Sequence, residues 1–239
     1  MLCPVQPIAV IDFETTGLSP GMGDRATEIA IVMLEGDQVV DRFQSLMNAG
    51  VRISGFIEAY TGISNQMIAD APSAEEVMAA ASRFVGDAPM AAHNASFDRR
   101  FWAAELERLG SGGPPANRFA PFACTMLLSR RLYPEAGSFR LGSLAAFHDL
   151  PSSGRAHRAM ADAEVAAALL KRIRRDLERR YPVDEAHHEL LVSVQASPRH
   201  RLAEVIGKFV NPRCPDALPT ARWQEPGVIS RVRLPTQEN

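Results

Sequence analysis

The 239-residue sequence has little of several features that mark whole classes of protein. Its three cysteines, Cys3, Cys124 and Cys214, lie far apart without C-x-x-C spacing, so neither a disulfide framework nor a zinc site is expected. The formal net charge is only −2, so any binding of nucleic acid must come from local patches. No apolar run is long enough to span a membrane, and no Lys or Arg precedes Ile8. We therefore expect no signal peptide, no membrane contact and a cytoplasmic location.

The apolar residues that are present, 46% of the chain, suffice for the core of one domain of ordinary size. Their spacing predicts strands at 8–13, 27–34 and 39–47, with a hairpin turn at 36–37. Further strands are expected at 89–92 and 122–124. Short helical turns are expected within 54–69, and helices at 73–85, 96–109, 125–133, 141–147, 158–180, 184–196 and 198–209. This order predicts an α/β fold in which helices cover both faces of a mixed sheet.

Two acids at the end of the first strand are the most informative local feature. Asp12 and Glu14 follow the apolar run 8–11, and in a strand residues two apart point to the same face. Two adjacent carboxylates repel each other, and a divalent metal ion would compensate them. Acidic pairs also occur on solvated strand faces, so the pair alone leaves both interpretations open.

Two more acids bear on this choice. Asp98 falls in the first turn of a predicted helix, where a carboxylate is also favoured by the helix dipole alone. Asp162 lies on the inward face of the predicted helix 158–180, because it precedes the apolar stripe that begins at Val165 by one turn. A buried carboxylate is costly unless it is paired or binds a metal, so Asp162 favours the metal interpretation. His157 stands five residues before it, in a loop with Arg155 and Arg158.

In this order and spacing, the motifs resemble those of the DEDDh-type 3′→5′ exonucleases, and the chain is similar to the proofreading epsilon subunit of bacterial DNA polymerase III. The resemblance covers about residues 6–180 and rests on the segments IDFETTGLSP, TGIS, AAHNASFDRRF and GRAHRAMADAEVAAALL. It implies a ribonuclease H-like, mixed five-stranded sheet, with three antiparallel strands plus parallel strands. It also implies an exonuclease domain, which we place at 1–182. Residues 183–239 fall outside the resemblance, and their own pattern predicts a helical extension with a Pro-rich tail.

The resemblance further implies a two-metal mechanism with Mg²⁺ or Mn²⁺. Asp12, Glu14 and Asp162 would hold one ion, and Asp12 with Asp98 the other. His157 would take the proton from the attacking water, a task that suits imidazole because it titrates near neutral pH.

Other motif residues would bind the substrate. The resemblance places Thr15, Thr16 and Ile63 at the terminal nucleotide and His93 and Asn94 near the scissile bond. Thr61 stands where the epsilon subunit usually carries His. For Phe13 and Phe97 we expect packing in the core rather than stacking on a base of the substrate. Arg140, Arg155 and Arg158 are candidates for contacts with backbone phosphates.

The expected substrate is the 3′ end of a nucleic acid, with single-stranded DNA first and RNA as the alternative. A catalytically silent binding module is a further alternative, although the complete acidic set speaks against it. Apolar residues within 183–209 predict helices that pack on the nuclease core or contact a partner protein. A proofreading role would need such a partner, whereas repair or trimming would not.

Overall fold

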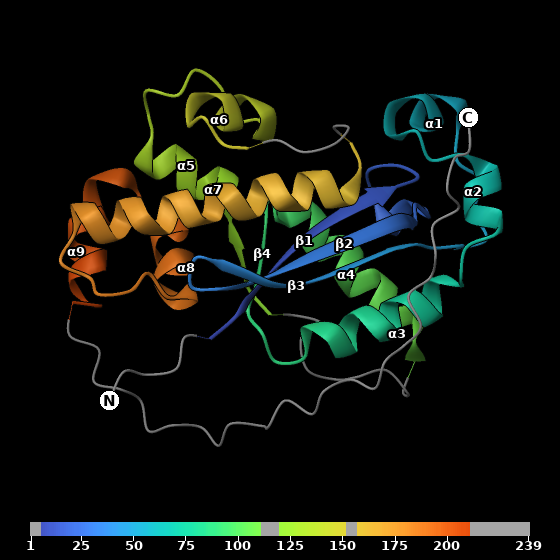
Figure 1. Ribbon diagram of the computed structural model, residues 1–239, viewed down its shortest axis with the longest axis horizontal. Coiled ribbons are helices and arrows are strands. Elements are labelled where there is room, and N and C mark those ends of the chain that lie inside the picture. The colour runs from blue at the N-terminus through green and yellow to red at the C-terminus, as the bar shows by residue number, and fades with distance from the viewer. Residues whose placement is uncertain (1–5, 111–119, 152–156, 211–239) are drawn as a thin grey trace.

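The computed structural model describes residues 6–110, 120–151 and 157–210. Within these residues the centre is a five-stranded mixed sheet in the order β3-β2-β1-β4-β5 (Figure 1). The first three strands, β1 (Ile8–Thr15), β2 (Ala26–Glu35) and β3 (Gln38–Leu46), form an antiparallel meander. Two short strands, β4 (Met90–Ala92) and β5 (Phe122–Cys124), run parallel to β1. The predicted mixed sheet is therefore confirmed.

Helices cover both faces of this sheet, as predicted. The long helix α7 (Ala159–Arg180) lies across one face, and α3 (Ala74–Val85) and α4 (Ser96–Arg108) pack on the other (Figure 1). Short helices α1 (Gly55–Thr61) and α2 (Asn65–Ala69) lie beyond one end of the sheet. The remaining elements are α5 (Thr125–Leu132), α6 (Leu141–Phe147), α8 (His188–Ala196), α9 (Leu202–Gly207) and the 3₁₀ turns η1 (Pro20–Met22) and η3 (Arg199–Arg201).

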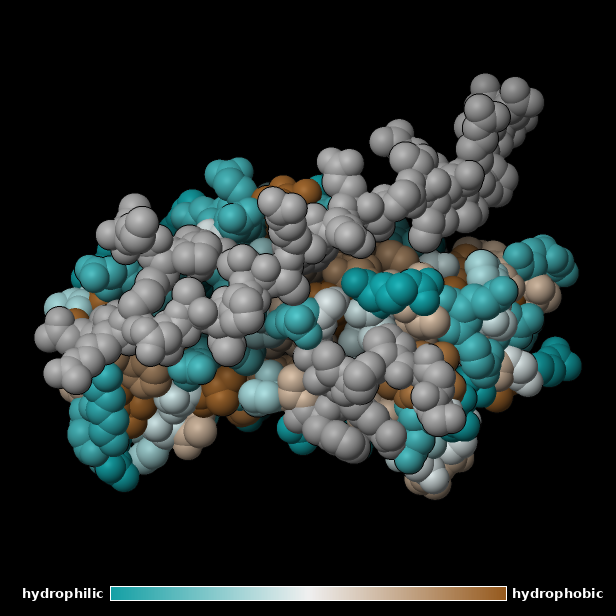
Figure 2. Space-filling view, turned by 90° about the horizontal axis from the view of Figure 1, so that it is seen from below, coloured by the Kyte–Doolittle hydropathy of each residue, from teal (hydrophilic) through white to brown (hydrophobic). Residues whose placement is uncertain are grey.

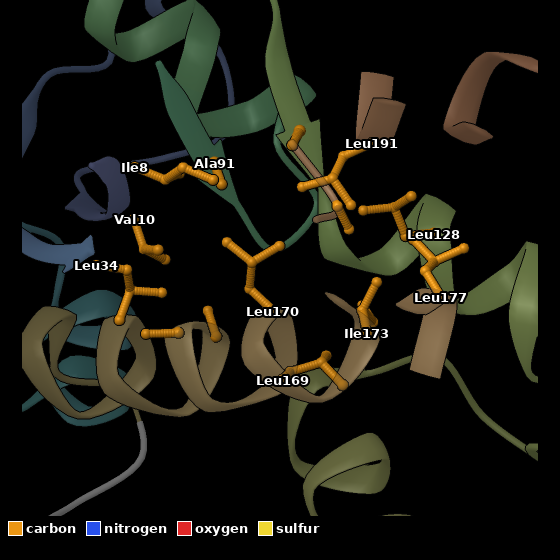
Figure 3. Close-up of a cluster of buried hydrophobic side chains, with 14 of the residues drawn as sticks. Ile8, Val10, Leu34, Ala91, Leu128, Leu169, Leu170, Ile173, Leu177 and Leu191 are labelled. Carbon is orange, nitrogen blue, oxygen red and sulfur yellow. The ribbon is translucent and has the colours of Figure 1, made fainter. Parts of the chain in front are cut away.

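The alternation of side chains along β1 divides the core into two clusters. Ile8 and Val10 pack with α7 and its neighbours, where Leu170 and Ile173 point toward the sheet (Figure 3). Ile11 and Phe13 face the opposite way, into the cluster built on α3 and α4. Core packing is thus confirmed for Phe13. The same alternation turns Asp12 and Glu14 toward the α7 side of the sheet.

Helix α3 shows how local sequence sets an element boundary. The Ser73 hydroxyl accepts a hydrogen bond from the Glu76 amide, and the Glu76 carboxylate accepts one from the Ser73 amide. These two hydrogen bonds form a capping box, which satisfies amide groups that the first turn leaves unpaired.

The helices after residue 182 pack on the same core as α7. Leu190, Leu191 and Val194 of α8 and Leu202 and Ile206 of α9 are buried in that cluster. The division of the chain after residue 182 stays a prediction. Two predicted helix starts were wrong: α8 begins at His188 rather than at 184, and the helix expected at 198–209 is the 3₁₀ turn η3 followed by α9, which begins at Leu202. His188 itself is partly buried, and its ring Nε2 lies 2.9 Å from the Met90 carbonyl oxygen.

One face of the molecule is shown in Figure 2. Where the described residues are visible in Figure 2, hydrophilic and hydrophobic residues are interspersed. Among the described helices, none combines the length and the apolar character that crossing a bilayer would require. Cys124 is buried as a free thiol, while Cys3, Cys214 and the predicted tail lie outside the described residues.

Candidate active site

Three carboxylates meet where the C-terminal end of β1 lies under the start of α7. Asp12 and Glu14 come from β1, and Asp162 comes from the first turn of α7. One ligand oxygen from each of the three lies within 4.8 Å of the other two. The inward position that the helical stripe predicted for Asp162 is therefore confirmed.

Asp98 approaches the same place from the opposite face of the sheet. The parallel ladder pairs Ala9 with Met90 and Val10 with Ala91 and then stops, because β4 is only three residues long. The next amide on that side of β1, that of Phe13, instead donates a 3.2 Å hydrogen bond to Asp98 Oδ1. Asp98 is 2% exposed, so the early end of β4 makes room for a buried carboxylate beside Asp12.

The electrostatics of the cluster are those of acids held together without enough positive charge. Burial, followed by the charges of Asp98 and Glu14, raises the pKa of Asp12 well above its usual range. Burial and then the charge of Asp162 raise the pKa of Glu14 from 4.5 to about 8. Burial also raises the pKa of Asp98 from 3.8 to about 8 and raises that of Asp162. These carboxylates cannot all ionise at neutral pH unless a cation joins them.

The donor set fits a divalent metal ion. The gathered atoms are carboxylate oxygens, which are the hard ligands that Mg²⁺ and Mn²⁺ prefer. Bringing Asp12, Glu14 and Asp162 to within a few ångströms of one another is unfavourable for the protein alone and favourable once a cation binds. The cluster thus has the composition and the charge of a site that could hold a metal.

His157 lies at the edge of the cluster with an unusual backbone. Its φ of 63° is left-handed, a conformation that costs a residue other than glycine about 1–3 kcal/mol. Its amide donates a 3.1 Å hydrogen bond to Asp162 Oδ2, which ties the histidine to the acidic cluster. Its ring stacks on that of Tyr60 in α1, with centroids 3.9 Å apart. The neighbouring Arg155 lies outside the described residues.

The segment after Glu14 is organised around one carboxylate. Thr16 Oγ1 lies 3.5 Å from Asp24 Oδ1, and the Ser19 amide donates to Asp24 Oδ2 at 2.9 Å. A Cβ atom at Gly17 would approach Asp24 Oδ1 to 2.4 Å, so any other residue there would displace the carboxylate that organises this segment. The hydroxyl of Thr15 donates to the Gly17 carbonyl at 2.6 Å. The roles of Thr15 and Thr16 at the terminal nucleotide stay predictions.

The residues expected near the scissile bond differ in their surroundings. His93 Nδ1 lies 2.8 Å from Thr125 Oγ1, and its Nε2 lies 3.1 Å from the Phe139 carbonyl oxygen. Burial lowers the pKa of His93 to about 4, so the ring is neutral and both nitrogens already have protein partners. Asn94 is exposed, with a left-handed φ of 57°. Substrate contacts by His93 and Asn94 stay predictions, and the contacts of His93 indicate a role in holding the chain near Phe139.

Two expectations need correction in this structure. Ile63 is fully buried with Ile53 and Ile68, so its side chain does not reach a base. The guanidinium of Arg158 forms a two-pronged ion pair with Glu28, so its charge is already paired rather than free for a phosphate, although 32% of the side chain is exposed. Arg140 is exposed, just before α6, and its contact with a phosphate stays a prediction.

Sequence reasoning missed three residues at the site. These are Asp24, which organises the segment after Glu14, Glu28, which pairs with Arg158, and Tyr60, which stacks on His157. Glu28 could have been noticed in the sequence, because it is an acid in a strand that is otherwise almost wholly apolar. Tyr60 could not have been noticed in this way, since its partner His157 is almost a hundred positions away in the chain.

Comparisons with known proteins agree with this geometry. The exonuclease family model matches residues 9–170, which include all four acids and His157. A PolC-type DNA polymerase III from Bacillus cereus is 35% identical over 168 residues, which cover 70% of this chain and 11% of that protein. The 3′-5′ exonuclease DinG from Bacillus subtilis is 36% identical over 172 residues, covering 70% of this chain and 18% of that protein. The chain thus spans less than a fifth of the length of these relatives.

Solved structures give the same result for the fold. Exonuclease X in complex with 5′ overhanging duplex DNA is 27% identical, with a TM-score of 0.57, over 83% of this chain and 98% of its own. The nuclease domain of 3′hExo, a DEDDh family member bound to rAMP, is 18% identical, with a TM-score of 0.60, over 71% of this chain and 92% of its own. By its family match the chain belongs to the exonuclease family, and its fold is similar to that of exonuclease X and of a DEDDh family member.

Proposed function

We propose that the protein is a metal-dependent 3′→5′ exonuclease that hydrolyses phosphodiester bonds at the 3′ end of DNA and releases nucleoside 5′-monophosphates. The observation that carries this proposal is the meeting of Asp12, Glu14 and Asp162, whose ligand oxygens lie within 4.8 Å of one another. Asp98 stands beside them, and its charge helps to raise the pKa of Asp12.

The four acids would hold two divalent ions, Mg²⁺ or Mn²⁺. When bound, such ions would activate a water molecule and neutralise the charge that develops on the phosphate. Asp12, Glu14 and Asp162 would hold one ion, and Asp12 and Asp98 the other. The start of α7 faces this cluster, so the partial positive charge of its N-terminus also favours the carboxylates and an incoming phosphate.

His157 would act as the general base. Its amide is anchored to Asp162, which fixes its backbone beside the cluster while its side chain lies on Tyr60. Imidazole is suited to take the proton of the attacking water at neutral pH. Thr15, Thr16 and Asn94 would orient the terminal nucleotide.

DNA is the favoured substrate because a DNA polymerase III is among the relatives above 30% identity, and because exonuclease X, which is 27% identical, was solved in complex with duplex DNA. The structural neighbours with RNA ligands share less than 20% identity and so support the fold alone. The match to PolC-type polymerases extends the proposal to proofreading or repair, with any partner protein contacting the helices after residue 182.

A degradation assay tests the proposal. Single strands of DNA and RNA, labelled at the 5′ end, are incubated with the protein in Mg²⁺, Mn²⁺ or EDTA. We expect DNA to shorten stepwise from the 3′ end, only with metal, and faster than RNA. Asp12→Asn should reduce the rate by several orders of magnitude, because it removes a ligand charge without changing the shape.

The matched control is Asp37→Asn, at the exposed hairpin between β2 and β3, where Asp37 pairs with Arg175. This variant should keep the wild-type rate. Full activity of Asp12→Asn would show that the site is assigned wrongly. Faster degradation of RNA than of DNA would move the substrate to the RNA class.

A further inference from the structure

A fifth acid, Glu28, lies beside the cluster and takes no part in the proposed metal site. It stands opposite Glu14 in the β1–β2 ladder and is 1% exposed. Its carboxylate accepts hydrogen bonds from Arg158 Nε and Nη2 at 3.1 and 2.9 Å, from the Ala159 amide at 3.2 Å and from Gln44 Nε2 at 2.9 Å. Three of these four contacts lead to the start of α7, and the fourth leads to Gln44 of β3.

Stability alone is a weak reason for this arrangement. A buried ion pair is often no more stable than apolar residues of the same volume, since desolvation offsets the attraction of the charges. Glu28 also places another negative charge close to Asp12 and Glu14, and that charge contributes to the raised pKa of both. Its presence at a crowded acidic site therefore calls for a role that an apolar pair would not fill.

At the start of α7, Glu28 contacts the two residues that directly follow His157. Arg158 is held through its side chain and Ala159 through its backbone amide, both by Glu28. The amide of His157 is held by Asp162. Two carboxylates thus fix three consecutive residues, one of which has the left-handed φ of 63°. The hydrogen bonds of Glu28 therefore link Arg158 and Ala159 to strand β2 of the sheet.

We propose that Glu28 and Arg158 form a positioning pair, which sets the place of His157 and Asp162 relative to the acids of β1. This inference rests on the proposed function. Neither residue touches the reacting atoms, so both would act through the geometry of the residues that do.

Arg158→Lys is the sharpest test, because lysine keeps the charge but cannot form the two-pronged contact with a carboxylate. We expect kcat to fall about 10- to 100-fold, as for small misplacements of catalytic groups, while KM stays near the wild-type value. Glu28→Gln, which keeps the shape of the side chain, should have a similar effect. Combining the two should add little to either, because both break one pair.

Arg174→Lys is the matched control. Arg174 is a buried arginine of the same helix, about 24 Å further along it, and it donates to the Ala186 and Gly36 carbonyls and to Glu185. The variant Arg174→Lys should lower Tm at least as much as Arg158→Lys does, and it should leave kcat unchanged. A loss of kcat in both variants that follows the loss of Tm, or a normal kcat in Arg158→Lys, would overturn the proposal.

Amide hydrogen exchange gives a readout that does not depend on activity. In peptides that contain 157–163, we expect faster exchange in Arg158→Lys and Glu28→Gln than in the wild type, and no change in Arg174→Lys. A wild-type protein that degrades no nucleic acid would refute the proposed function, while the exchange data would still decide on the pair. Unchanged exchange at 157–163 in both pair variants would refute the pair itself.

Discussion

Tyr60 is the residue that shapes the surroundings of the proposed general base. Its ring is stacked on His157 at an interplanar angle of 27°, and on its other side it neighbours the ring of Phe56. Tyr60 is 49% exposed and Phe56 is 75% exposed, so little but this stack restrains either ring. The imidazole therefore has a defined resting place close to the acids, which limits how far it must move when substrate binds.

Removing the Tyr60 ring should weaken catalysis without affecting the fold. Stacked aromatic pairs contribute about 0.5–1.5 kcal/mol, so Tyr60→Ala should lower kcat by about 2- to 12-fold. Tyr60→Phe keeps the ring and should retain the wild-type kcat. Phe56→Ala, which removes a ring that does not stack on His157, is the control for KM effects. An increase of kcat in Tyr60→Ala would show instead that the stack restrains His157 away from the substrate.

For individual residues, the sequence predicted the acids of the site better than it predicted the residues that surround and contact them. Asp12 and Glu14 follow from strand alternation and Asp162 from a helical stripe, which are both local patterns. Glu28 could not be understood from the sequence, because its partner Arg158 lies 130 positions away. Ile63 was misjudged because its burial depends on packing against Ile53 and Ile68.

Among the elements, α8 has an unusual relation to the edge of the sheet. Gln195 projects from α8 onto β5, where its Oε1 accepts from the Cys124 amide and its Nε2 donates to the Phe122 carbonyl at 2.9 Å. One side chain thereby supplies the two hydrogen bonds that a further strand would make. Sheet edges are sites of unwanted pairing, and this contact protects the β5 edge.

Gln195→Met should destabilise the protein, because it leaves the buried amide of Cys124 and the buried carbonyl of Phe122 without partners. Each unsatisfied group costs about 1–3 kcal/mol, so the free energy of unfolding should fall by about 2 kcal/mol or more. Urea unfolding measures this change. The control is Gln66→Met, at an exposed glutamine that contacts only Asp70. Equal stability of the two variants would contradict the role of Gln195.

Element boundaries were less predictable than element types, and residues 184–187 show why. Their composition suits a helix, yet Arg174 binds the Ala186 carbonyl and the Glu185 carboxylate, and Glu178 binds the Ala186 amide. These contacts use backbone groups that a helix would need for itself. Tertiary structure therefore delays the start of α8 to His188.

For the molecule as a whole, the acidic cluster couples folding to pH and to metal. A carboxyl whose pKa is raised in the folded state contributes stability at low pH that is lost as the pH rises through its folded pKa. Glu14, whose pKa rises from 4.5 to about 8, and Asp98, whose pKa rises from 3.8 to about 8, define the window.

Without metal, the contribution of these two acids should therefore lower Tm as the pH rises from about 4 to about 8. Added Mg²⁺ or Mn²⁺ should raise Tm, and more strongly at pH 8 than at pH 5, because protons compete with the metal for the same oxygens. Thermal unfolding over this range, with metal or EDTA, measures both effects. The variant Asp12→Asn should show a smaller response to metal. A metal effect that is equal at both pH values would contradict this coupling.

Helix α7 has a consequence for the molecule that its sequence alone does not suggest. It is unbroken over 22 residues, about 33 Å, with Asp162 near one end and the contacts of Arg174 with the segment before α8 near the other (Figure 1). A straight helix moves as one body. A protein that binds to α8 and α9 and shifts them would therefore shift α7 as well. This shift would change the position of Asp162 relative to Asp12 and Glu14 of β1.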